Sequence, residues 1–431
     1  MYQKLNQIDH VLKRPDVYIG STRPRNSYEY VYSDNNRIEK KSVHISPAIL
    51  RIFIEPLSNV VDNFARSKQK NIVASKLEIN IDSTTGETTF WNDGDVIPIE
   101  IHPTEKCYNH TLIFGQLLTS SNYNDSEDRI DISGKNGIGI KATGIFSKQI
   151  IVEGADPINK KHFSQTWTNN LKTTSKPNVS SFKGTKGYTK ISYIPDFEQF
   201  ELKHYTADII SLYKRYAADV AMLTKMTVLF NDEILPVKSL LDYAKLYSTL
   251  DTTEYQCIKT QNSDVVITPS YSEFEAISFA NGIFTPLGGT HIDAWTEALF
   301  RPLVEKLNKP KKPQINIADV KKFFRLFVVA SVNRPSFDSQ SKLKLESPTI
   351  EASPSKTHIN NLCKWSVMDQ LENLIRMKEL SVLKNVERKK GFKRIEGLSP
   401  ANNEGGKNGR ECILAIVEGD SAKTFASHGL Q

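Results

Sequence analysis

The stretch ILRIFIEPLSNVVDN at residues 49–63 has the apolar spacing of an amphipathic helix. At about 100° per residue, Glu55, Asn59 and Asp62 fall within roughly 60° of one another on its polar side. A carboxylate one turn before an amide suits a nucleotide hydrolase, in which Glu55 takes a proton from water and Asn59 offers an oxygen to Mg²⁺. Taken alone, this segment is better explained as a solvated helix face. The downstream motifs have to decide between the two interpretations.

The composition is that of an ordinary globular chain, with 431 residues, 39% hydrophobic and 24% charged. This length predicts two to three domains at about 150 residues each. No apolar run approaches the roughly 20 residues needed to span a bilayer, and the N-terminus lacks a signal-peptide core. We therefore expect an intracellular protein, nuclear or cytoplasmic, or one of a viral replication compartment. The net charge of +7 is compatible with a polyanionic partner without requiring one.

Four cysteines, at positions 107, 257, 363 and 412, are too widely spaced for a metal knuckle or a disulfide framework, and we expect them to be reduced. Periodicity predicts a hairpin at residues 77–82 and 88–91. It further predicts helices at 205–222, 291–307 and 364–387, and strands at 226–230, 274–280 and 326–332. A Gly/Asn-rich linker follows at 396–410, and residues 412–417 have the pattern of a buried strand that begins another unit.

A glycine-rich loop, SGKNGIGIK, occupies residues 133–141 and leads into an apolar helical run. Its glycines let the backbone approach an anion, the helix start points free N–H groups at it, and Lys141 adds a positive charge. The loop is neither a Walker sequence nor a Rossmann fingerprint, because the required spacing and context are missing. A purely structural turn is the alternative.

Two further segments carry groups suited to a nucleotide. Asn92 and Asp93, before Gly94 at a strand end, offer an amide and a carboxylate for an adenine edge, although the same residues make an ordinary turn. Ser120, Ser121 and Asn122 suit ribose and phosphate contacts, or simply a helix end.

The order of these segments resembles the ATP site of the gyrase, Hsp90, histidine kinase and MutL superfamily. Further motifs follow the same order along the chain: YQKL at 2–5, RPDVYIGS at 14–21, LLTSSNY at 117–123, SGKNGIG at 133–139, FDSQSK at 337–342 and EGDSAK at 418–423. With these motifs the chain is most similar to the type IIA DNA topoisomerases of the eukaryotic and viral kind.

The resemblance implies an α+β fold in three parts. Residues 1–195 would be a GHKL (Bergerat) ATPase α/β sandwich with an N-terminal dimerisation arm. Residues 196–395 would be a transducer domain of ribosomal-protein-S5-like fold, and residues 396–431 a linker and the truncated start of a Toprim domain.

The resemblance also implies residue roles in an ATP and Mg²⁺ site. Glu55 would be the general base, Asn59 the Mg²⁺ ligand and Asn92 the adenine contact. Gln340 and Lys342 would reach the γ-phosphate from the second domain, stabilising its charge and reporting its presence. The remaining nucleotide contacts would be Asp62, Asn63, Ser120, Ser121, Asn122, Lys135, Asn136, Gly137, Ile138, Gly139, Lys141 and Thr189, together with Tyr2 inserted into the partner subunit's site.

Glu418 opens a Toprim-like pattern and would hold Mg²⁺ for DNA cleavage in the family. The later Asp-x-Asp pair and the domain of the DNA-attacking tyrosine are absent, so we expect an N-terminal portion that hydrolyses ATP without cleaving DNA. Lys309, Lys311 and Lys312 occupy a loop where relatives carry DNA-sensing lysines, and binding there would ignore base sequence. A solvated surface is the alternative for these lysines.

One departure from the family pattern affects the helix that carries the proposed base. Pro56 follows Glu55 where an aliphatic residue is usual, which predicts a kink or a tight start at that point. The sequence favours a gate that ATP closes as a homodimer around double-stranded DNA. The alternatives are a chaperone or mismatch-repair ATPase with the same nucleotide fold, and a clamp that has lost hydrolysis through Pro56.

Overall fold

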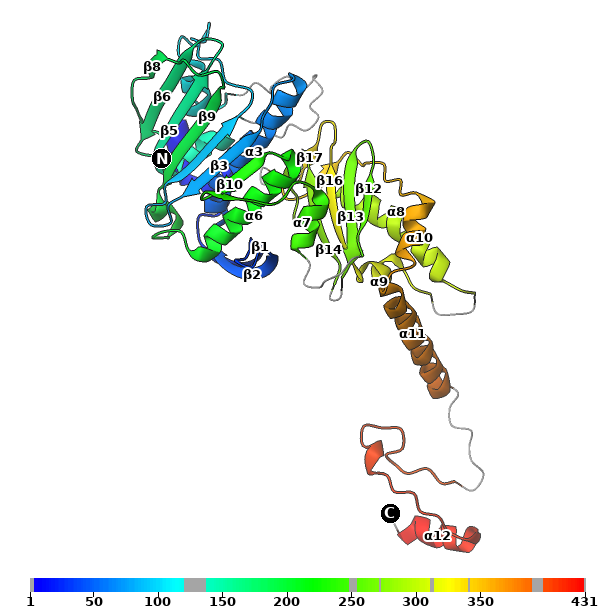
Figure 1. Ribbon diagram of the computed structural model, residues 1–431. Helices are drawn as coiled ribbons and strands as arrows, with labels where there is room; N and C mark the ends of the chain where they lie inside the picture. Colours follow the sequence, from blue (N-terminus) through cyan, green and yellow to red (C-terminus); the bar gives the residue numbers. More distant parts are fainter. Residues whose placement is uncertain are drawn as a thin grey trace. The chain divides into compact units, whose positions relative to one another are not determined.

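The computed structural model describes residues 4–119, 137–247, 254–270, 273–310, 314–339, 342–389 and 398–429. The chain forms two compact units (Figure 1). Unit 1 comprises Met1–Asn308 and Ile315–Leu371, and unit 2 comprises Lys309–Gln314 and Glu372–Gln431. Both large sheets and the residues around Glu55 belong to unit 1.

The first sheet has nine strands within the described residues. They are, in sheet order, β11 (Glu233–Ile234), β10 (Thr227–Phe230), β3 (Lys76–Ile81), β4 (Thr88–Asp93), β9 (Tyr188–Pro195), β5 (Ser147–Asp156), β6 (Lys161–Thr168) and β7 (Thr173–Thr174), and β8 (Asn178–Ser181) also pairs with β6. Neighbours are antiparallel except for β10, which runs parallel to β3. Asn231, just after β10, exchanges side-chain hydrogen bonds with the backbone N–H and carbonyl of Ile81.

One face of this sheet is covered by α3 (Pro47–Gln69), α5 (Gly139–Ile145) and α6 (Ala207–Thr224). Strand β3 alternates buried Leu77, Ile79 and Ile81 with more accessible side chains, which is the pattern of a sheet buried on one face. On the helix side, Phe53 stacks on Tyr213 of α6 with ring centroids 3.8 Å apart and contacts Phe90 of β4. Aromatic packing therefore fixes α3 between α6 and the sheet.

The helix predicted at residues 49–63 is confirmed and is longer at both ends, spanning Pro47–Gln69. Capping signals explain its earlier start. The Ser46 hydroxyl accepts a hydrogen bond from the Ile49 N–H at 3.0 Å, and Pro47 occupies the first helical position. Pro56 lies inside this continuous helix. Of the two predicted outcomes at Pro56, the tight start is therefore wrong, and the kink stays a prediction.

The second sheet has the order β12 (Gln256–Lys259), β13 (Ser263–Pro269), β16 (Phe324–Ala330), β14 (Glu275–Ala280) and β15 (Ile283–Phe284) among the described residues. The helices that contact it include α7 (Leu240–Leu246), α8 (Thr290–Leu307), α9 (Ile317–Lys321) and α10 (Lys356–Leu362). The predictions near α6, α8, β10, β14 and β16 are confirmed to within a few residues.

Several smaller elements also belong to unit 1. The N-terminal helices α1 (Gln7–Lys13) and α2 (Pro15–Tyr18) precede the hairpin β1 (Arg25–Tyr32) and β2 (Ile38–Ile45), which packs on α6. Helix α4 (Asn109–Gly115) contacts α5, and the short hairpin β17 (Ser336–Phe337) and β18 (Leu345–Ser347) carries the loop with Lys342.

The strand predicted at residues 412–417 is wrong. Between α11 (Val367–Lys389) and α12 (Gly419–Gly429) these residues form no regular structure, and Ile413 and Ile416 are each 90% exposed. A buried strand needs neighbouring strands, and none of the described strands pairs with this segment. Over the part of the chain that the structure describes, no helix is both long and apolar enough to cross a membrane.

Candidate functional site

The carboxylate of Glu55 lies where α3 meets the end of the glycine-rich loop. Its Oε1 pairs with Nη2 of Arg51 at 2.5 Å, one turn earlier, and the two side chains are only 13% and 11% exposed. Its Oε2 points at the start of α5, so closely that a Cβ added at Gly139 would lie 1.8 Å from it. Only a glycine at position 139 leaves room for this carboxylate. The structure thus brings the predicted base and the predicted loop into contact.

The next turns of α3 connect to the end of β4. Asn63 donates from Nδ2 to the Asp95 carbonyl at 2.6 Å, and its Oδ1 accepts a hydrogen bond from Asn92 Nδ2 at 3.4 Å. Gly94 has φ +118°, and a Cβ there would lie 2.6 Å from Asn63 Oδ1. The glycine is required both by its conformation and by this close approach. Asn63 and Asn92 therefore form one hydrogen-bonded group beside the polar face of α3.

Asp93 has a structural role that the sequence did not reveal. Its Oδ1 accepts hydrogen bonds from the N–H groups of Ser75 (2.7 Å) and Lys76 (2.9 Å), and the Ser75 hydroxyl donates to Oδ2. These bonds hold the beginning of β3 against the end of β4, so the interpretation of Asp93 as an adenine contact is not supported. Thr189 lies opposite Asn92 in the β4–β9 register, and its role as a nucleotide contact stays a prediction.

Lys141 is only 2% exposed and points back toward the preceding segment. Its Nζ donates to the Thr119 carbonyl at 2.7 Å, and burial lowers its pKa to about 8. The Lys141 side chain therefore links α5 to Thr119. Gly137, with φ +60°, and Ile138 lead into α5. Asn59 is partly buried on the polar face of α3, and Asp62 is 3% exposed.

Several predicted contacts lie outside the described residues: Tyr2, Ser120, Ser121, Asn122, Lys135, Asn136, Lys311, Lys312 and Gln340. Lys342 is described. Its backbone adopts φ +57° in the loop between β17 and β18, and its N–H donates to the Ser339 carbonyl at 3.1 Å.

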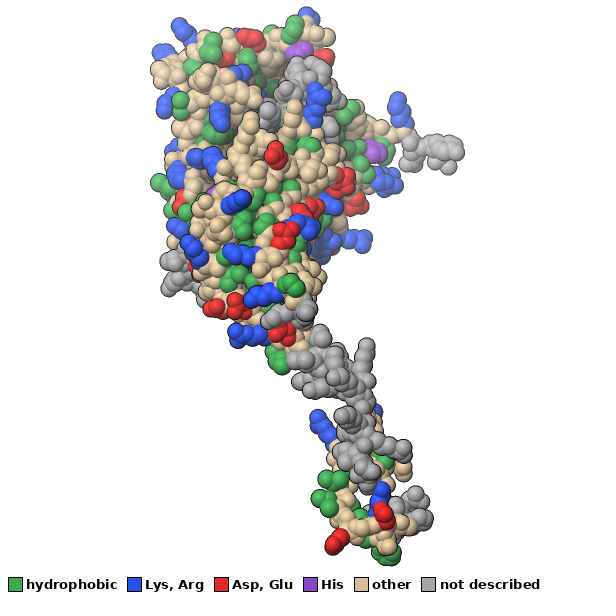
Figure 2. All heavy atoms as spheres, turned by 90° about the vertical axis from the view of Figure 1, so that its right-hand side faces the viewer, with side chains coloured by type: hydrophobic (Ala, Val, Ile, Leu, Met, Phe, Trp, Pro, Cys, Tyr) green, Lys and Arg blue, Asp and Glu red, His purple; other side chains and the backbone are tan. Residues whose placement is uncertain are grey.

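The structure says less about the residues predicted to contact DNA or to begin a Toprim domain. Lys309 and Glu418 are exposed and belong to unit 2. On the face drawn in Figure 2, Lys and Arg side chains are interspersed with acidic ones. Within the described ranges, no cluster of three His, Cys, Asp or Glu side chains is arranged to hold a metal.

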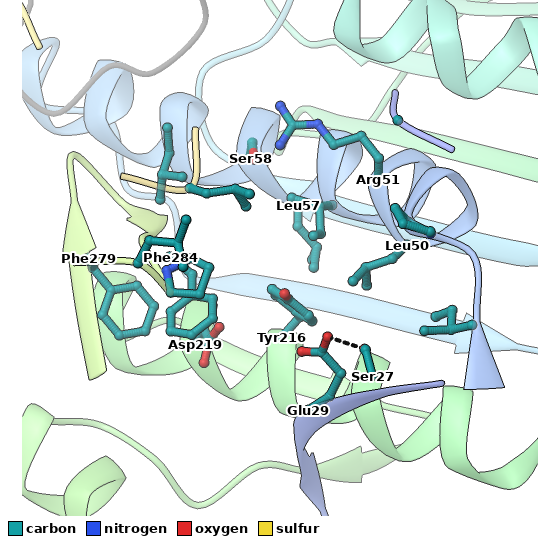
Figure 3. A pocket seen from close by; sticks show the side chains of 18 of the residues that line it. Ser27, Glu29, Leu50, Arg51, Leu57, Ser58, Tyr216, Asp219, Phe279 and Phe284 are labelled. Atoms are coloured by element: carbon teal, nitrogen blue, oxygen red, sulfur yellow. Dashed lines mark hydrogen bonds between the residues drawn. The ribbon is translucent and has the colours of Figure 1, made fainter. Parts of the chain in front are cut away.

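A cavity of about 350 Å³ lies beside α3 (Figure 3). Leu50 and Leu57 face Tyr216 of α6 across it, Phe279 and Phe284 close one end, and neither Glu55 nor Asn59 lines it. This mainly apolar space lies between α3, α6 and the β14–β15 hairpin, and Arg51, the partner of Glu55, is among the residues that line it.

Sequence reasoning missed two residues that build the site. Arg51 stands four residues before Glu55, a spacing that puts both on one helix face, so this signal was available. Thr143 gave no signal, because its contact with α3 depends on the packing of two helices distant in sequence. Its hydroxyl donates to the Ile52 carbonyl at 2.9 Å.

Comparisons with known proteins show what the chain is similar to. Residues 228–386 match the DNA gyrase B family. The whole chain is 40% identical to DNA topoisomerase 2 of Invertebrate iridescent virus 6 and spans 40% of that protein's length.

Solved structures give the same result for the fold. The ATPase region of Saccharomyces cerevisiae topoisomerase II superposes with a TM-score of 0.80 at 31% identity, over 87% of this chain and 99% of that one. The ATPase and transducer domains of DNA topoisomerase II from Balamuthia mandrillaris give 0.78 at 32% identity, over 88% and 98%. The expected α+β fold, a GHKL ATPase followed by a transducer, is confirmed. The Toprim start stays a prediction.

Proposed function

Because the chain belongs to the type II DNA topoisomerase family, we propose that it is the ATP-operated dimerisation gate of a longer enzyme of that family. The observation that carries the proposal is the Glu55 carboxylate, held by Arg51 and lodged against Gly139 at the end of the glycine-rich loop. A base oriented by a second group and placed beside a phosphate-binding loop is suited to activate a water molecule for attack on a phosphoryl group.

The two oxygens of Glu55 would have different tasks. Oε1 is engaged by Arg51, which fixes the orientation of the carboxylate. Oε2 faces the backbone at Gly139 and would take the proton from the attacking water. Asn92, which is hydrogen-bonded to Asn63, would meet the adenine beside Thr189.

The residues on the polar face of α3 suit Mg²⁺. This ion prefers oxygen ligands and is usually held by one or two protein groups together with substrate phosphates. Asn59 would supply the protein oxygen, and the ion would neutralise charge on the phosphates. A preformed cluster of three protein ligands is not needed for such an ion.

The part of unit 1 that contains the second sheet would detect the γ-phosphate of ATP through Gln340 and Lys342. Backbone contacts tie their loop to the start of α8. The Leu345 N–H donates to the Gly288 carbonyl at 3.1 Å, and a Cβ at Gly289 would lie 2.1 Å from the Leu345 carbonyl oxygen. Lys342 would contact the γ-phosphate of bound ATP and would lose that contact when the phosphate leaves.

Closure would join two copies of the chain, with Tyr2 of each inserted into the nucleotide site of the other. Lys309, Lys311 and Lys312 would contact the phosphates of double-stranded DNA independently of sequence. Strand passage belongs to the longer enzyme, in which ATP binding closes the gate around one duplex.

Sedimentation and steady-state hydrolysis together test the proposal. The chain should be a monomer or weak dimer without nucleotide, and a stable dimer with a non-hydrolysable ATP analogue, because the analogue favours the closed state. Deleting residues 1–8 should abolish the shift in mass while each copy still binds the analogue. Equal mass at saturating analogue would contradict the gate. A clamp without hydrolysis would dimerise with ATP itself and release no phosphate.

A further inference from the structure

Pro56 removes one hydrogen bond from the middle of α3. A residue at this position normally donates its N–H to the carbonyl of Ile52, four residues earlier. Proline has no N–H, and its ring crowds that carbonyl. Ile52 is fully buried, so solvent has no ready access to replace the missing donor.

Thr143 of α5 provides a donor at this point. Its Oγ1 donates to the Ile52 carbonyl oxygen at 2.9 Å, and Thr143 is itself fully buried. A threonine hydroxyl inside a helix often bonds to a carbonyl of its own helix. Here it bonds across to a neighbouring helix, while the Thr143 carbonyl accepts a hydrogen bond from the Ser147 hydroxyl at 2.6 Å.

A second contact joins the same two helices one turn away. Gly139, four residues before Thr143, approaches Oε2 of Glu55, three residues after Ile52. Together the two contacts fix the turn of α3 that carries Glu55 against the end of the glycine-rich loop.

We propose that Thr143 is a positioning residue for Glu55: its hydroxyl replaces the hydrogen bond that Pro56 removes and so holds the proposed base at the loop. The catalytic part of this inference rests on the proposed function. The structural part does not, since it concerns only the pairing of Thr143 with the Ile52 carbonyl.

The inference predicts that Pro56 and Thr143 depend on each other. Thr143→Val keeps the size of the side chain and removes the hydroxyl, which leaves the buried carbonyl without that donor. Pro56→Ala restores an N–H four residues after Ile52, so the hydroxyl becomes dispensable. Thr143→Ser keeps a hydroxyl and is the matched control.

A double-mutant cycle on the full chain, followed by urea unfolding, measures this dependence. Thr143→Val should raise the unfolding equilibrium constant by roughly tenfold in the native background and by less than about twofold in Pro56→Ala. Thr143→Ser should stay near the native value. If Thr143→Val alone fails to fold, the inference requires that the double variant folds. Equal effects in both backgrounds, or failure of both variants to fold, would overturn it.

Hydrolysis separates positioning from a merely structural role. Thr143→Val should lower kcat about tenfold and change KM for ATP by less than about twofold, because the displaced group acts on water. Adding Pro56→Ala should return kcat to that of Pro56→Ala alone. A rise in KM with unchanged kcat would overturn the positioning of Glu55. If the native chain has no ATPase activity, the proposed function is refuted. The double-mutant unfolding cycle would then still test the hydrogen bond between Thr143 and the Ile52 carbonyl.

Discussion

Helices α3 and α6 each carry an arginine four residues before an acid, and the two pairs differ in what surrounds the carboxylate. Arg51 and Glu55 are 11% and 13% exposed, whereas Arg215 and Asp219 are 1% and 5% exposed. An arginine that precedes the acid is the less favourable order along a helix, so intrinsic helix stabilisation explains neither pair. Their tertiary surroundings give each pair its role.

The second oxygen of each carboxylate makes the difference. Asp219 has both oxygens in contact with protein groups, because the Tyr243 hydroxyl donates to Oδ1 at 2.5 Å and Arg215 lies 3.4 Å from Oδ2. Arg215 also packs over the Phe284 ring at 3.9 Å, which joins α6 to β15 of the second sheet. Glu55 gives one oxygen to Arg51 and turns the other toward the glycine-rich loop. The same spacing thus makes a structural joint in α6 and a candidate base in α3.

Glu55→Gln tests the comparison with the largest expected effect. The substitution keeps the shape and removes the group that accepts a proton, so ATP turnover should fall by about 10²- to 10⁴-fold. Affinity for a non-hydrolysable analogue should change little. Phosphate release and equilibrium binding measure the two quantities. A parallel loss of both would give Glu55 a structural role like that of Asp219.

The substitutions Arg215→Met and Arg51→Met compare how much each ion pair contributes to the free energy of unfolding. Arg215→Met leaves Asp219 buried without its cation, and the free energy of unfolding should fall by about 3–5 kcal/mol. Arg51→Met should cost on the order of 1 kcal/mol, because Glu55 is closer to solvent. Urea unfolding of each variant against the native chain measures the difference. Equal losses would remove the distinction between the pairs.

The pH dependence of stability sharpens the account of Asp219. Burial raises its pKa to about 6, while Arg215 opposes that shift. Between pH 4 and 6 the folded chain therefore binds more protons than the unfolded chain, and this contribution to stability decreases as pH rises, by at most ~1.4 kcal/mol per pH unit. The difference between the native chain and Asp219→Asn in thermal midpoint across this range isolates the effect. Parallel curves would show that Asp219 titrates normally.

The pH dependence of stability contributed by Lys141 is expected to have the opposite sign. It bonds to a carbonyl rather than a carboxylate, and burial lowers its pKa from 10.5 to about 8. Between these values the unfolded chain binds more protons, so stability should increase with pH over that window relative to Lys141→Met. An ATP analogue whose phosphates approach Lys141 should raise its pKa and flatten the increase. An unchanged slope with saturating analogue would place the phosphates elsewhere.

Local patterns predicted the elements better than the contacts between them. Periodicity located α3, α6 and α8 because each has an apolar face, and the end of α3 was underestimated because its polar last turn carries no such signal. The segment at 412–417 misled for a related reason. An apolar run identifies a strand only when partners are present to pair with it.

The part of the candidate site that the sequence predicted consists of residues whose side-chain chemistry itself suggests a function. Glu55, Asn59 and the glycine-rich loop stood out from their chemistry and their order along the chain. The roles of Asp93 and Thr143 depend on backbone groups of Ser75, Lys76 and Ile52, which come near only when the chain folds. The burial of Arg215 and Asp219 was equally hidden, since the same spacing is common on solvated helices.

The parallel pairing of β10 with β3 limits where the chain can be shortened without exposing a strand edge. A piece ending at Pro195 would lose β10 and β11, together with the clasp of Asn231 on Ile81. Strand β3 would then become an open edge, with unpaired N–H and carbonyl groups ready to bind another copy. Such a piece would self-associate without any nucleotide and imitate the dimerisation that ATP is proposed to cause. A piece meant to report nucleotide-dependent association has to extend at least through Ile234.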